Sequence, residues 1–260
     1  MTASPGLVDL EGLAVEICAL ARGAAAAILE CRARGIATRA KDDASPVTDA
    51  DEAANDLIVE GLAALTPDIP IVAEESVARG EVPTLTGRRF WLVDPLDGTK
   101  EFIAGRDEFT VNIALIEDAR PVLAVVQLPP LDLLFLGIVG KGAWRQVGAG
   151  ARAAIGARQT PAEGATVLAS RSHFSEATND WLRGVATASL RRAGSSYKFC
   201  LIAAGEADLY PRLGRTMEWD TAAGHGVLAA AGGSVRTLGG AELAYGKPGF
   251  ENPHFIARGA

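Results

Sequence analysis

Hydrophobic and polar positions alternate with two different periodicities along the chain, one typical of helices and one typical of strands. Leu, Val, Ile and many Ala residues recur every three to four positions from Leu7 to about Arg32, which predicts a long amphipathic helix. A second helix is expected from about Thr48 to Leu65, and Thr66-Pro67 ends it, because a residue before proline disfavours the helical conformation. Between the two helices, Lys41–Val47 is polar and predicts a loop.

Short apolar runs of strand length follow these helices. The first is Ile69–Ala73, which ends in Glu74-Glu75-Ser76 and leads into a polar loop. Four more expected strands are Arg89–Val93, Phe109–Glu117, Pro121–Gln127 and Leu133–Val139, with a hairpin turn at Asp118-Ala119-Arg120. The elements expected farther along are a strand at Thr166–Ser170, helices near Ser175–Ala186 and Ser195–Gly205, a strand at Ala207–Pro211 and a helix at Asp220–Ala231.

Strands flanked by helices in both halves predict an α/β (α+β) fold built as a layered sandwich. We expect two subdomains, residues 1–150 and residues 151–260, with the boundary near Gly150, where the pattern changes to alternating strands and helices. The N-terminal subdomain would carry most of the acidic candidate residues, and the C-terminal subdomain would carry Asp220.

Composition and charge narrow the class of protein. The chain has 260 residues, a formal net charge of -7 and three histidines, which disfavours a nucleic-acid-binding module because such binding rests on basic surface. Cys18, Cys31 and Cys200 are scattered, which argues against a disulfide framework or a zinc site and favours a reducing cytoplasm. No apolar run approaches the ~20 residues that an integral membrane span needs.

One segment carries the clearest chemistry. The apolar run that ends at Val93 is followed by Asp94-Pro95-Leu96-Asp97-Gly98-Thr99. Pro95 and Gly98 favour a turn, which would present both aspartates together at the end of a strand. Two close carboxylates repel one another unless a proton or a cation lies between them, and carboxylates with a backbone carbonyl favour a hard cation such as magnesium. Taken alone, the segment also fits an ordinary turn.

Three further acids are expected at the ends of elements. Glu74 follows the Ile69–Ala73 strand, Asp220 begins the last predicted helix, and Asp51 lies in the first turn of the second helix. Helix starts favour acids through capping, and Thr48-x-x-Asp51 resembles a capping box, so each acid also has a purely structural explanation. Because ligand sites of α/β proteins form at the ends of strands and the starts of helices, the acids together favour a metal cluster.

These segments resemble, in order and over nearly the whole chain, the lithium-sensitive, magnesium-dependent phosphatases of the inositol monophosphatase superfamily. The resemblance rests on Glu74-Glu75-Ser76, Asp94-Pro95-Leu96-Asp97-Gly98-Thr99 and Trp219-Asp220-Thr221-Ala222-Ala223-Gly224. It implies the αβαβα sandwich of that superfamily. It also implies two or three Mg²⁺ ions per active site, the first held by Glu74, Asp94 and the Leu96 carbonyl and the second by Asp94, Asp97 and Asp220.

The resemblance also assigns the catalytic group. Thr99 and Asp51 would orient and deprotonate the attacking water, and Glu74 would act with them. Hydrolysis of a phosphate ester needs charge neutralisation and a water in line with the leaving group, which two metal ions can supply. The substrate would contact Glu74, Leu96, Asp97, Gly98, Thr99 and Asp220 from this side of the site.

Within the superfamily, several segments resemble the bacterial CysQ-type 3′(2′),5′-bisphosphate nucleotidases. They are Lys100-Glu101-Phe102, Ser170-Arg171-Ser172-His173, Gly194-Ser195-Ser196-Tyr197-Lys198-Phe199-Cys200 and Asp208-Leu209-Tyr210-Pro211-Arg212. The resemblance implies removal of the 3′-phosphate of adenosine 3′,5′-bisphosphate, and of the corresponding phosphosulfate, in sulfur assimilation. Ser195, Lys198 and Arg212 would bind the second phosphate, for which Lys and Arg are natural partners, and His173 would lie near the nucleotide. Lys198, Arg212 and His173 could instead be ordinary surface residues.

Other functions remain open from the sequence. An inositol monophosphatase or a sugar bisphosphatase would use the same metal ligands, and a non-catalytic scaffold could keep the same fold. The expected partner is a small nucleotide bisphosphate, without nucleic acid, and the expected assembly is a monomer or a homodimer. The expected location is the cytoplasm, with peripheral association at the cytoplasmic face of the inner membrane as the other option.

Overall fold

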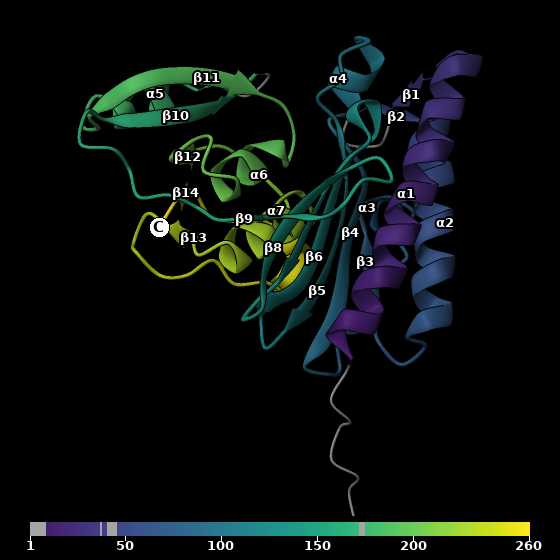
Figure 1. The fold of residues 1–260 in the computed structure, drawn as a ribbon. Coiled ribbons are helices and arrows are strands. Elements are labelled where there is room, and N and C mark those ends of the chain that lie inside the picture. The colour runs from purple at the N-terminus through teal and green to yellow at the C-terminus, as the bar shows by residue number, and fades with distance from the viewer. Residues whose placement is uncertain (1–8, 37, 41–45, 172–174) are drawn as a thin grey trace, which may run out of the picture.

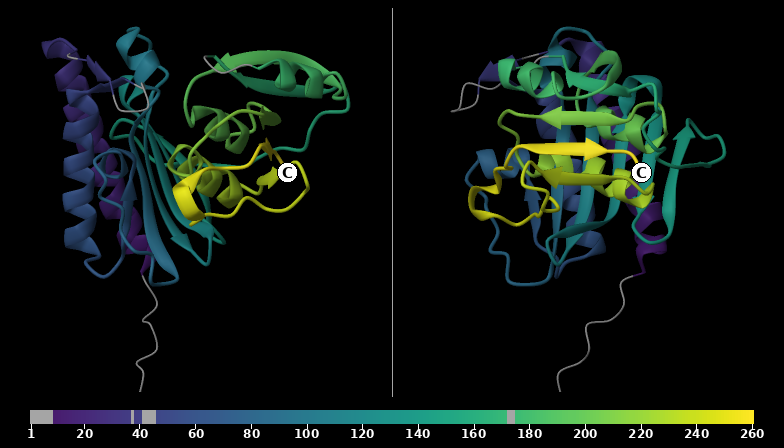
Figure 2. Two further views of the ribbon diagram at one scale, coloured as in Figure 1. Left: turned by 180° about the vertical axis from the view of Figure 1, so that it is seen from behind. Right: turned by 90° about the vertical axis from the view of Figure 1, so that its left-hand side faces the viewer.

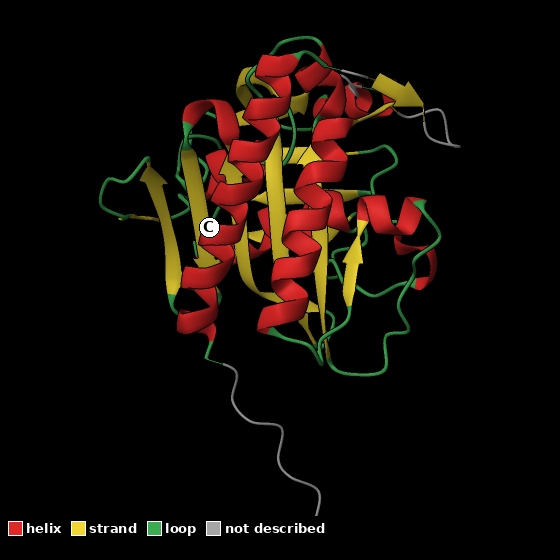
Figure 3. Cartoon of the chain, turned by 90° about the vertical axis from the view of Figure 1, so that its right-hand side faces the viewer, coloured by secondary structure: helices red, strands yellow, loops and turns green. Residues whose placement is uncertain are grey.

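Two N-terminal amphipathic helices pack on one face of a large sheet. The computed structural model describes residues 9–36, 38–40, 46–171 and 175–260, and it contains helix α1 (Leu10–Arg34) and helix α2 (Asp49–Leu65) as predicted. The Asp9 carboxylate caps α1, because it accepts hydrogen bonds from the backbone N–H groups of Glu11 and Gly12 at 3.1 Å. Figure 3 shows both helices lying across the sheet.

The sheet behind them has seven strands in the order β3-β4-β5-β6-β7-β8-β9. Only β3 and β4 are parallel, and each later strand pairs antiparallel with the one before it. The strands are β3 (Ile71–Ala73), β4 (Arg89–Asp97), β5 (Thr110–Glu117), β6 (Arg120–Leu128), β7 (Leu133–Ile138), β8 (Gly142–Val147) and β9 (Ala153–Ile155).

A second sheet of five strands has the order β11-β10-β12-β14-β13. The pairs β10–β11 and β10–β12 are parallel, and the other two pairs are antiparallel. Its strands are β10 (Ala165–Ser170), β11 (Thr187–Ala193), β12 (Leu209–Arg212), β13 (Ser234–Thr237) and β14 (Phe255–Arg258).

Two helices, α6 (Tyr197–Ala203) and α7 (Trp219–Ala230), lie between the sheets, and α5 (Glu176–Leu182) covers the outer face of the five-stranded sheet. The layers therefore follow the predicted αβαβα order (Figures 1 and 2). The remaining elements are α3 (Glu74–Ala78), α4 (Thr99–Ile103), the short strands β1 (Thr38–Ala40) and β2 (Pro46–Thr48), and 3-10 turns at Pro129–Leu131 and Pro248–Phe250.

Helix α7 approaches the seven-stranded sheet unusually closely because glycines line the contact. A Cβ atom on Gly137 of β7 would lie 2.7 Å from the Val227 Cα and 2.8 Å from the Gly226 carbonyl oxygen of α7. A Cβ atom on Gly226 would lie 2.6 Å from the Ala124 Cβ of β6. Since neither backbone can retreat without moving a whole element, these glycines fix where the N-terminus of α7, and Asp220 with it, meets the sheet.

Several expected boundaries were wrong. Strand β4 continues to Asp97, through an irregularity in its pairing with β5 between Asp94 and Asp97, and does not end at Val93. The polar residues after β3 form α3, because Glu74 begins a helical turn directly at the end of the strand. Pro46 and Val47 belong to β2 and pair with β1, so they are not loop residues, while residues 41–45 lie outside the described part of the chain.

The helix expected at Ser195–Gly205 also starts later than predicted. Ser195 has a φ of 45° and Ser196 is the N-cap of α6, so Ser195 is not at a helix start. The helix expected at Ser175–Ala186 ends at Leu182, and β11 follows it. Strands β8, β9, β11, β13 and β14 were not predicted, because they are short and several have no apolar alternation.

Helix α1 is long and apolar enough to cross a membrane, on length and composition alone. In the fold its residues Ile17, Ala21 and Ile28 are fully buried in the core cluster between the helices and the seven-stranded sheet. Cys18, Cys31 and Cys200 are all free thiols, as expected. The division into subdomains at residue 150 stays a prediction, with β9 of the larger sheet ending just beyond it.

Candidate active site

A cavity of about 640 Å³ opens where the two halves of the chain meet. One side comes from α3, from the end of β4 and from the start of α4, and the other side comes from the 194–198 segment, β12 and the start of α7. The predicted residues that line it are Glu74, Asp94, Leu96, Asp97, Gly98, Thr99, Ser195, Lys198, Arg212 and Asp220. His173 lies outside the described residues.

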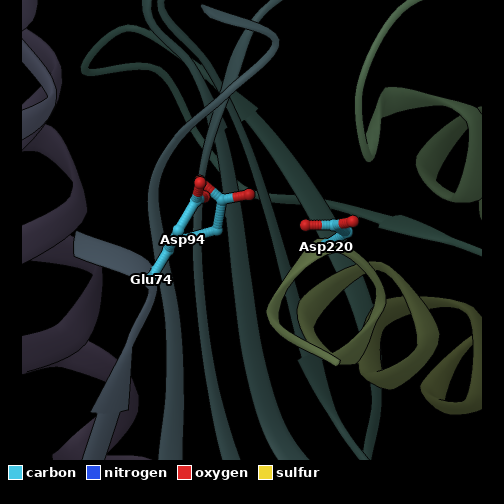
Figure 4. A group of neighbouring side chains, drawn as sticks. All are labelled: Glu74, Asp94 and Asp220. Carbon is cyan, nitrogen blue, oxygen red and sulfur yellow. The ribbon is translucent and has the colours of Figure 1, made fainter. Parts of the chain in front are cut away.

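Three carboxylates from three separate segments face one another in this cavity. Glu74, Asp94 and Asp220 each offer an oxygen atom within 4.8 Å of the others. Figure 4 shows Glu74, at the start of α3, beside Asp94 of β4, with Asp220 facing them from the start of α7. The structure thus brings Asp94 and Asp220 together, although they lie 126 residues apart in the sequence.

Asp97 lines the same cavity but lies outside this three-carboxylate group. Its Oδ2 atom accepts a hydrogen bond from the Ser196 backbone N–H at 2.6 Å and one from the Asn112 side-chain amide at 3.4 Å. These contacts hold Asp97 at the junction between β4, β5 and α6. Its other carboxylate oxygen is left for a ligand.

Local backbone geometry presents the Asp94–Thr99 segment. The Leu96 backbone N–H donates to Asp94 Oδ1 at 3.1 Å, which closes the turn expected around Pro95. Gly98 has a φ of 98° and is the N-cap of α4, so Thr99 is the first helical residue. A Cβ atom on Gly98 would also lie 3.2 Å from the Glu108 carbonyl oxygen.

Thr99 and Asp51 are within hydrogen-bond distance. The Thr99 hydroxyl lies 3.1 Å from Asp51 Oδ1 and 3.2 Å from the Leu96 carbonyl oxygen. The other Asp51 oxygen, Oδ2, accepts hydrogen bonds from the Thr48 hydroxyl at 2.6 Å and from the Thr48 backbone N–H at 2.7 Å. The capping box at the start of α2 is present as predicted, and the same carboxylate reaches Thr99.

The electrostatics of the site disfavour so many negative charges together. Surrounding protein atoms displace water and raise the pKa of Asp220 to about 8, with Asp97 and Glu74 as further contributors. Displacement of water likewise raises the pKa of Asp97, while Lys198 and the Ser196 N–H oppose this rise. Burial also raises the pKa of Asp51 against the lowering effect of its hydrogen bonds.

The donor set fits a metal ion. Carboxylates that are costly to ionise in a water-poor cavity become favourable when a divalent cation lies among them. Among the described residues, this part of the site offers oxygen ligands from Glu74, Asp94, Asp220, Asp97 and the Leu96 carbonyl, and such a set suits a hard cation.

Basic residues line the cavity as well, and Lys198 and Arg212 are the buried ones among them. Lys198 is almost fully buried, and its amine donates to the Ser195 carbonyl at 2.6 Å. Burial lowers the pKa of Lys198 to about 8, although Asp97 opposes this, and Arg212 adds to the lowering. The Ser195 hydroxyl and the Arg212 Nε atom are buried and have no hydrogen-bond partner among the described residues. Buried polar atoms without partners at a cavity wall are suited to bind a ligand.

Sequence reasoning missed Asn112 and Ser196, which contact Asp97. A polar residue in the apolar Phe109–Glu117 run was the available signal for Asn112, because a fully buried amide in a sheet needs a polar partner. Ser196 carried no such signal, since serine is common before helices.

Comparison with known proteins gives consistent matches over nearly the full chain. Residues 9–256 match the model of the inositol monophosphatase family. The chain is 46% identical over 243 residues to the 3′(2′),5′-bisphosphate nucleotidase CysQ of Salmonella typhimurium, a match that covers 92% of this chain and 97% of the relative.

Solved structures agree with these matches. The crystal structure of CysQ from Bacteroides thetaiotaomicron, a bacterial member of the inositol monophosphatase family, superposes with a TM-score of 0.82 at 34% identity, covering 97% of this chain and 99% of the other. An inositol monophosphatase from Zymomonas mobilis gives a TM-score of 0.78 at 28% identity, covering 97% of this chain and 94% of the other.

Proposed function

The chain belongs to the inositol monophosphatase family, and we propose that within it the protein is a magnesium-dependent 3′(2′),5′-bisphosphate nucleotidase. It would hydrolyse the 3′-phosphate of adenosine 3′,5′-bisphosphate to give AMP and phosphate, and would act on the corresponding phosphosulfate as a second substrate. The observation that carries this proposal is one cavity lined both by a carboxylate cluster and by the buried Lys198 and Arg212. The relatives named CysQ support the same reading.

The carboxylates of the cavity would hold the metal ions. Glu74, Asp94 and the Leu96 carbonyl would hold one magnesium ion, and Asp94, Asp97 and Asp220 would hold a second. When bound, these ions supply charge neutralisation for the phosphate ester and acidify a water molecule. Glu74 would also help to orient that water from its place beside Asp94.

Thr99 and Asp51 would accept the proton of the attacking water. The Thr99 hydroxyl donates its hydrogen to Asp51 Oδ1 at 3.1 Å, so its oxygen lone pairs can face a water molecule in the cavity. As the water loses a proton to the Thr99 oxygen, the Thr99 hydrogen passes to Asp51. Thr48 holds the other Asp51 oxygen, so Asp51 stays aimed at Thr99 during this transfer.

Ser195, Lys198 and Arg212 would distinguish a bisphosphate substrate from a monophosphate substrate. Arg212 Nε and the Ser195 hydroxyl are buried donors without a partner in the part of the chain that the structure describes, and the Lys198 amine donates to the Ser195 carbonyl. A 5′-phosphate placed there would receive hydrogen bonds and two positive charges. An inositol monophosphate has no second phosphate to use these groups, so it is the alternative substrate that the site supports less well.

Phosphate release from adenosine 3′,5′-bisphosphate, with and without Mg²⁺, tests the proposal. We expect Mg²⁺-dependent release, inhibition by lithium as in the resembled phosphatases, and a higher kcat/KM than for inositol 1-phosphate. A preference for inositol 1-phosphate would overturn the nucleotidase assignment. Absence of hydrolysis of every phosphate ester would favour the non-catalytic scaffold.

The location and the oligomeric state of the protein are proposals as well. A cytoplasmic location fits an enzyme that acts on a soluble nucleotide, and peripheral association with a membrane gains no support from the comparisons. Whether the protein works as a monomer or a homodimer stays a prediction, which sedimentation of the purified protein decides.

A further inference from the structure

One buried serine connects two of the proposed metal ligands. Ser196 is almost fully buried, and its backbone N–H donates to the Asp97 carboxylate at 2.6 Å. Its hydroxyl donates to the backbone carbonyl oxygen of Asp220 at 2.7 Å. The same residue therefore contacts the side chain of Asp97, from the end of β4, and the backbone of Asp220, from the start of α7.

Asn112 completes this network from the central part of the sheet. It is fully buried on β5, directly opposite Asp94 in the β4–β5 pairing. Its amide nitrogen lies 3.2 Å from the Ser196 hydroxyl and 3.4 Å from Asp97 Oδ2. This orientation of the amide is favoured, because the reverse orientation would place the amide oxygen against the carboxylate.

These hydrogen bonds occupy one oxygen of each acid and leave the other available. Asp97 uses Oδ2 for Ser196 and Asn112, and Asp220 uses Oδ2 for the Met217 backbone N–H at 2.9 Å. The free oxygens therefore have a fixed direction before any ion binds. Groups that orient the ligands of a metal in this way strongly influence its affinity.

The network also adds hydrogen bonds between parts of the chain that otherwise meet through packing. Asp97 belongs to the seven-stranded sheet, Asp220 belongs to α7, and Ser196 precedes the separate helix α6. Without the Ser196 hydroxyl, the backbone carbonyl of Asp220 loses its hydrogen-bond donor and the Asn112 amide loses an acceptor. The separation of the two acids would then be set by packing alone.

We propose that Ser196, supported by Asn112, is a positioning residue that fixes the separation of Asp97 and Asp220 and thereby the affinity of the site for the divalent cation bound by both. The proposal rests on the metal assignment made under the proposed function, and it concerns only the ion that these two acids share. The ion held by Glu74, Asp94 and the Leu96 carbonyl would use neither Asp97 nor Asp220, and it serves as an internal reference.

The test is a titration of the substrate-free protein with Mn²⁺, followed by electron paramagnetic resonance, which counts free ions and needs no turnover. For Ser196→Ala we expect the dissociation constant of one of the two ions to rise tenfold or more, while that of the other changes by less than about threefold. Asn112→Leu, which keeps the side-chain volume but removes the amide, should weaken the same ion. The double variant should lose less than the product of the single losses, because both residues act in one network.

Ser189→Ala is the matched control. Ser189 lies on the exposed strand β11, far from the acids in the sequence, and its hydroxyl is hydrogen-bonded to the Thr166 hydroxyl of β10. It should leave both dissociation constants unchanged. Thermal melting of each variant shows whether it is folded, and Asn112→Leu decides the question if Ser196→Ala does not fold.

Two results would overturn the inference. One is unchanged binding of both ions in folded Ser196→Ala and Asn112→Leu proteins, and the other is equal weakening of both ions. Failure of the unsubstituted protein to bind Mn²⁺ would instead overturn the metal assignment itself, so the two failures are distinguishable.

Discussion

At the scale of single residues, the site uses side chains that already have a structural role. Asp51 closes the capping box of α2 with one oxygen and accepts the Thr99 hydrogen bond with the other. Lys198 packs over the Tyr210 ring at 5.0 Å and also faces the cavity. The purely structural explanation for an acid at a helix start was therefore correct for Asp51 and does not exclude a catalytic one.

The Thr48 hydroxyl is expected to set the pH at which Asp51 can act. Burial raises the pKa of Asp51, and the hydrogen bonds from Thr48 and Thr99 lower it. Thr48→Val removes one hydrogen bond at nearly constant volume, so the pKa of Asp51 should rise. A proton acceptor must be ionised, so the acidic limb of the kcat profile should move to higher pH. Thr48→Ser keeps the hydroxyl and should leave the limb in place, whereas equal profiles for both variants would contradict this role of Thr48.

Lys198 is expected to act on binding of the second phosphate. Lys198→Met keeps the apolar packing against Tyr210 but removes the charge, and loss of a charged hydrogen bond should raise KM for adenosine 3′,5′-bisphosphate about tenfold or more. Turnover of a monophosphate should change little. Steady-state kinetics on both substrates measure this, with Lys141→Met, at an exposed turn, as the control. An unchanged KM would show that Lys198 has only a packing role.

At the scale of elements, the position of α7 decides whether Asp220 reaches the other acids. The helix is held against β6 and β7 through Gly226 and Gly137, whose missing side chains permit backbone contact. The N-terminal end of α7 is fixed further by Glu218, whose fully buried carboxylate accepts the backbone N–H groups of Gly246 and Lys247 at 2.6 and 2.9 Å. The helix thus delivers one ligand from a rigid support.

Gly137→Ala should affect both stability and activity. The new Cβ atom would lie 2.7 Å from the Val227 Cα, so α7 must shift, at a cost of about 1–3 kcal/mol in the free energy of unfolding. The shift would displace Asp220, so kcat should fall as well. Gly156→Ala is the control, because nothing lies within 4 Å of its Cβ position. Urea unfolding and kinetics of both variants measure the effects. Equal stabilities would show that α7 can shift away from β7 at little cost in free energy.

At the scale of the whole molecule, the layered architecture buries polar groups between the two sheets. His225 lies in α7 within this interior, and its Nδ1 atom is 3.0 Å from the Tyr245 hydroxyl. Burial lowers the pKa of His225 to about 3, and Arg120 adds to the lowering. The neutral imidazole is therefore the form that the fold accommodates.

The protein should lose stability in acid partly through this histidine. The unfolded chain binds a proton at His225 below about pH 6.5, and the folded protein does so only near pH 3, so the free energy of unfolding falls as the pH decreases between these values. The contribution reaches at most about 1.4 kcal/mol per pH unit.

His225→Gln removes the titrating group and keeps a partner for Tyr245. Urea unfolding at pH 7 and pH 5 should show a smaller loss of stability in this variant than in the unsubstituted protein. Identical pH dependence in the two proteins would mean that the pKa of His225 is the same in the folded and the unfolded protein.

The sequence by itself determined the features that depend on neighbouring residues. The two long helices, the central strands, the turn at Asp94–Thr99 and the capping box at Thr48–Asp51 follow from apolar spacing and from local hydrogen bonding, so they could be predicted. Resemblance to a family supplied the layer order. Strands such as β11 and β14 escaped prediction because pairing with distant strands, not their own pattern, makes them strands.

Only the tertiary structure decided which residues meet. It places Glu74, Asp94 and Asp220 within 4.8 Å of one another, sets Thr99 at 3.1 Å from Asp51, and reveals Asn112 and Ser196 as the partners of Asp97. Such distances arise from the packing of α7 and α6 against a sheet formed by another part of the chain. Sequence spacing carries no record of that packing, because side-chain contacts between remote elements depend on shape and volume across the whole core.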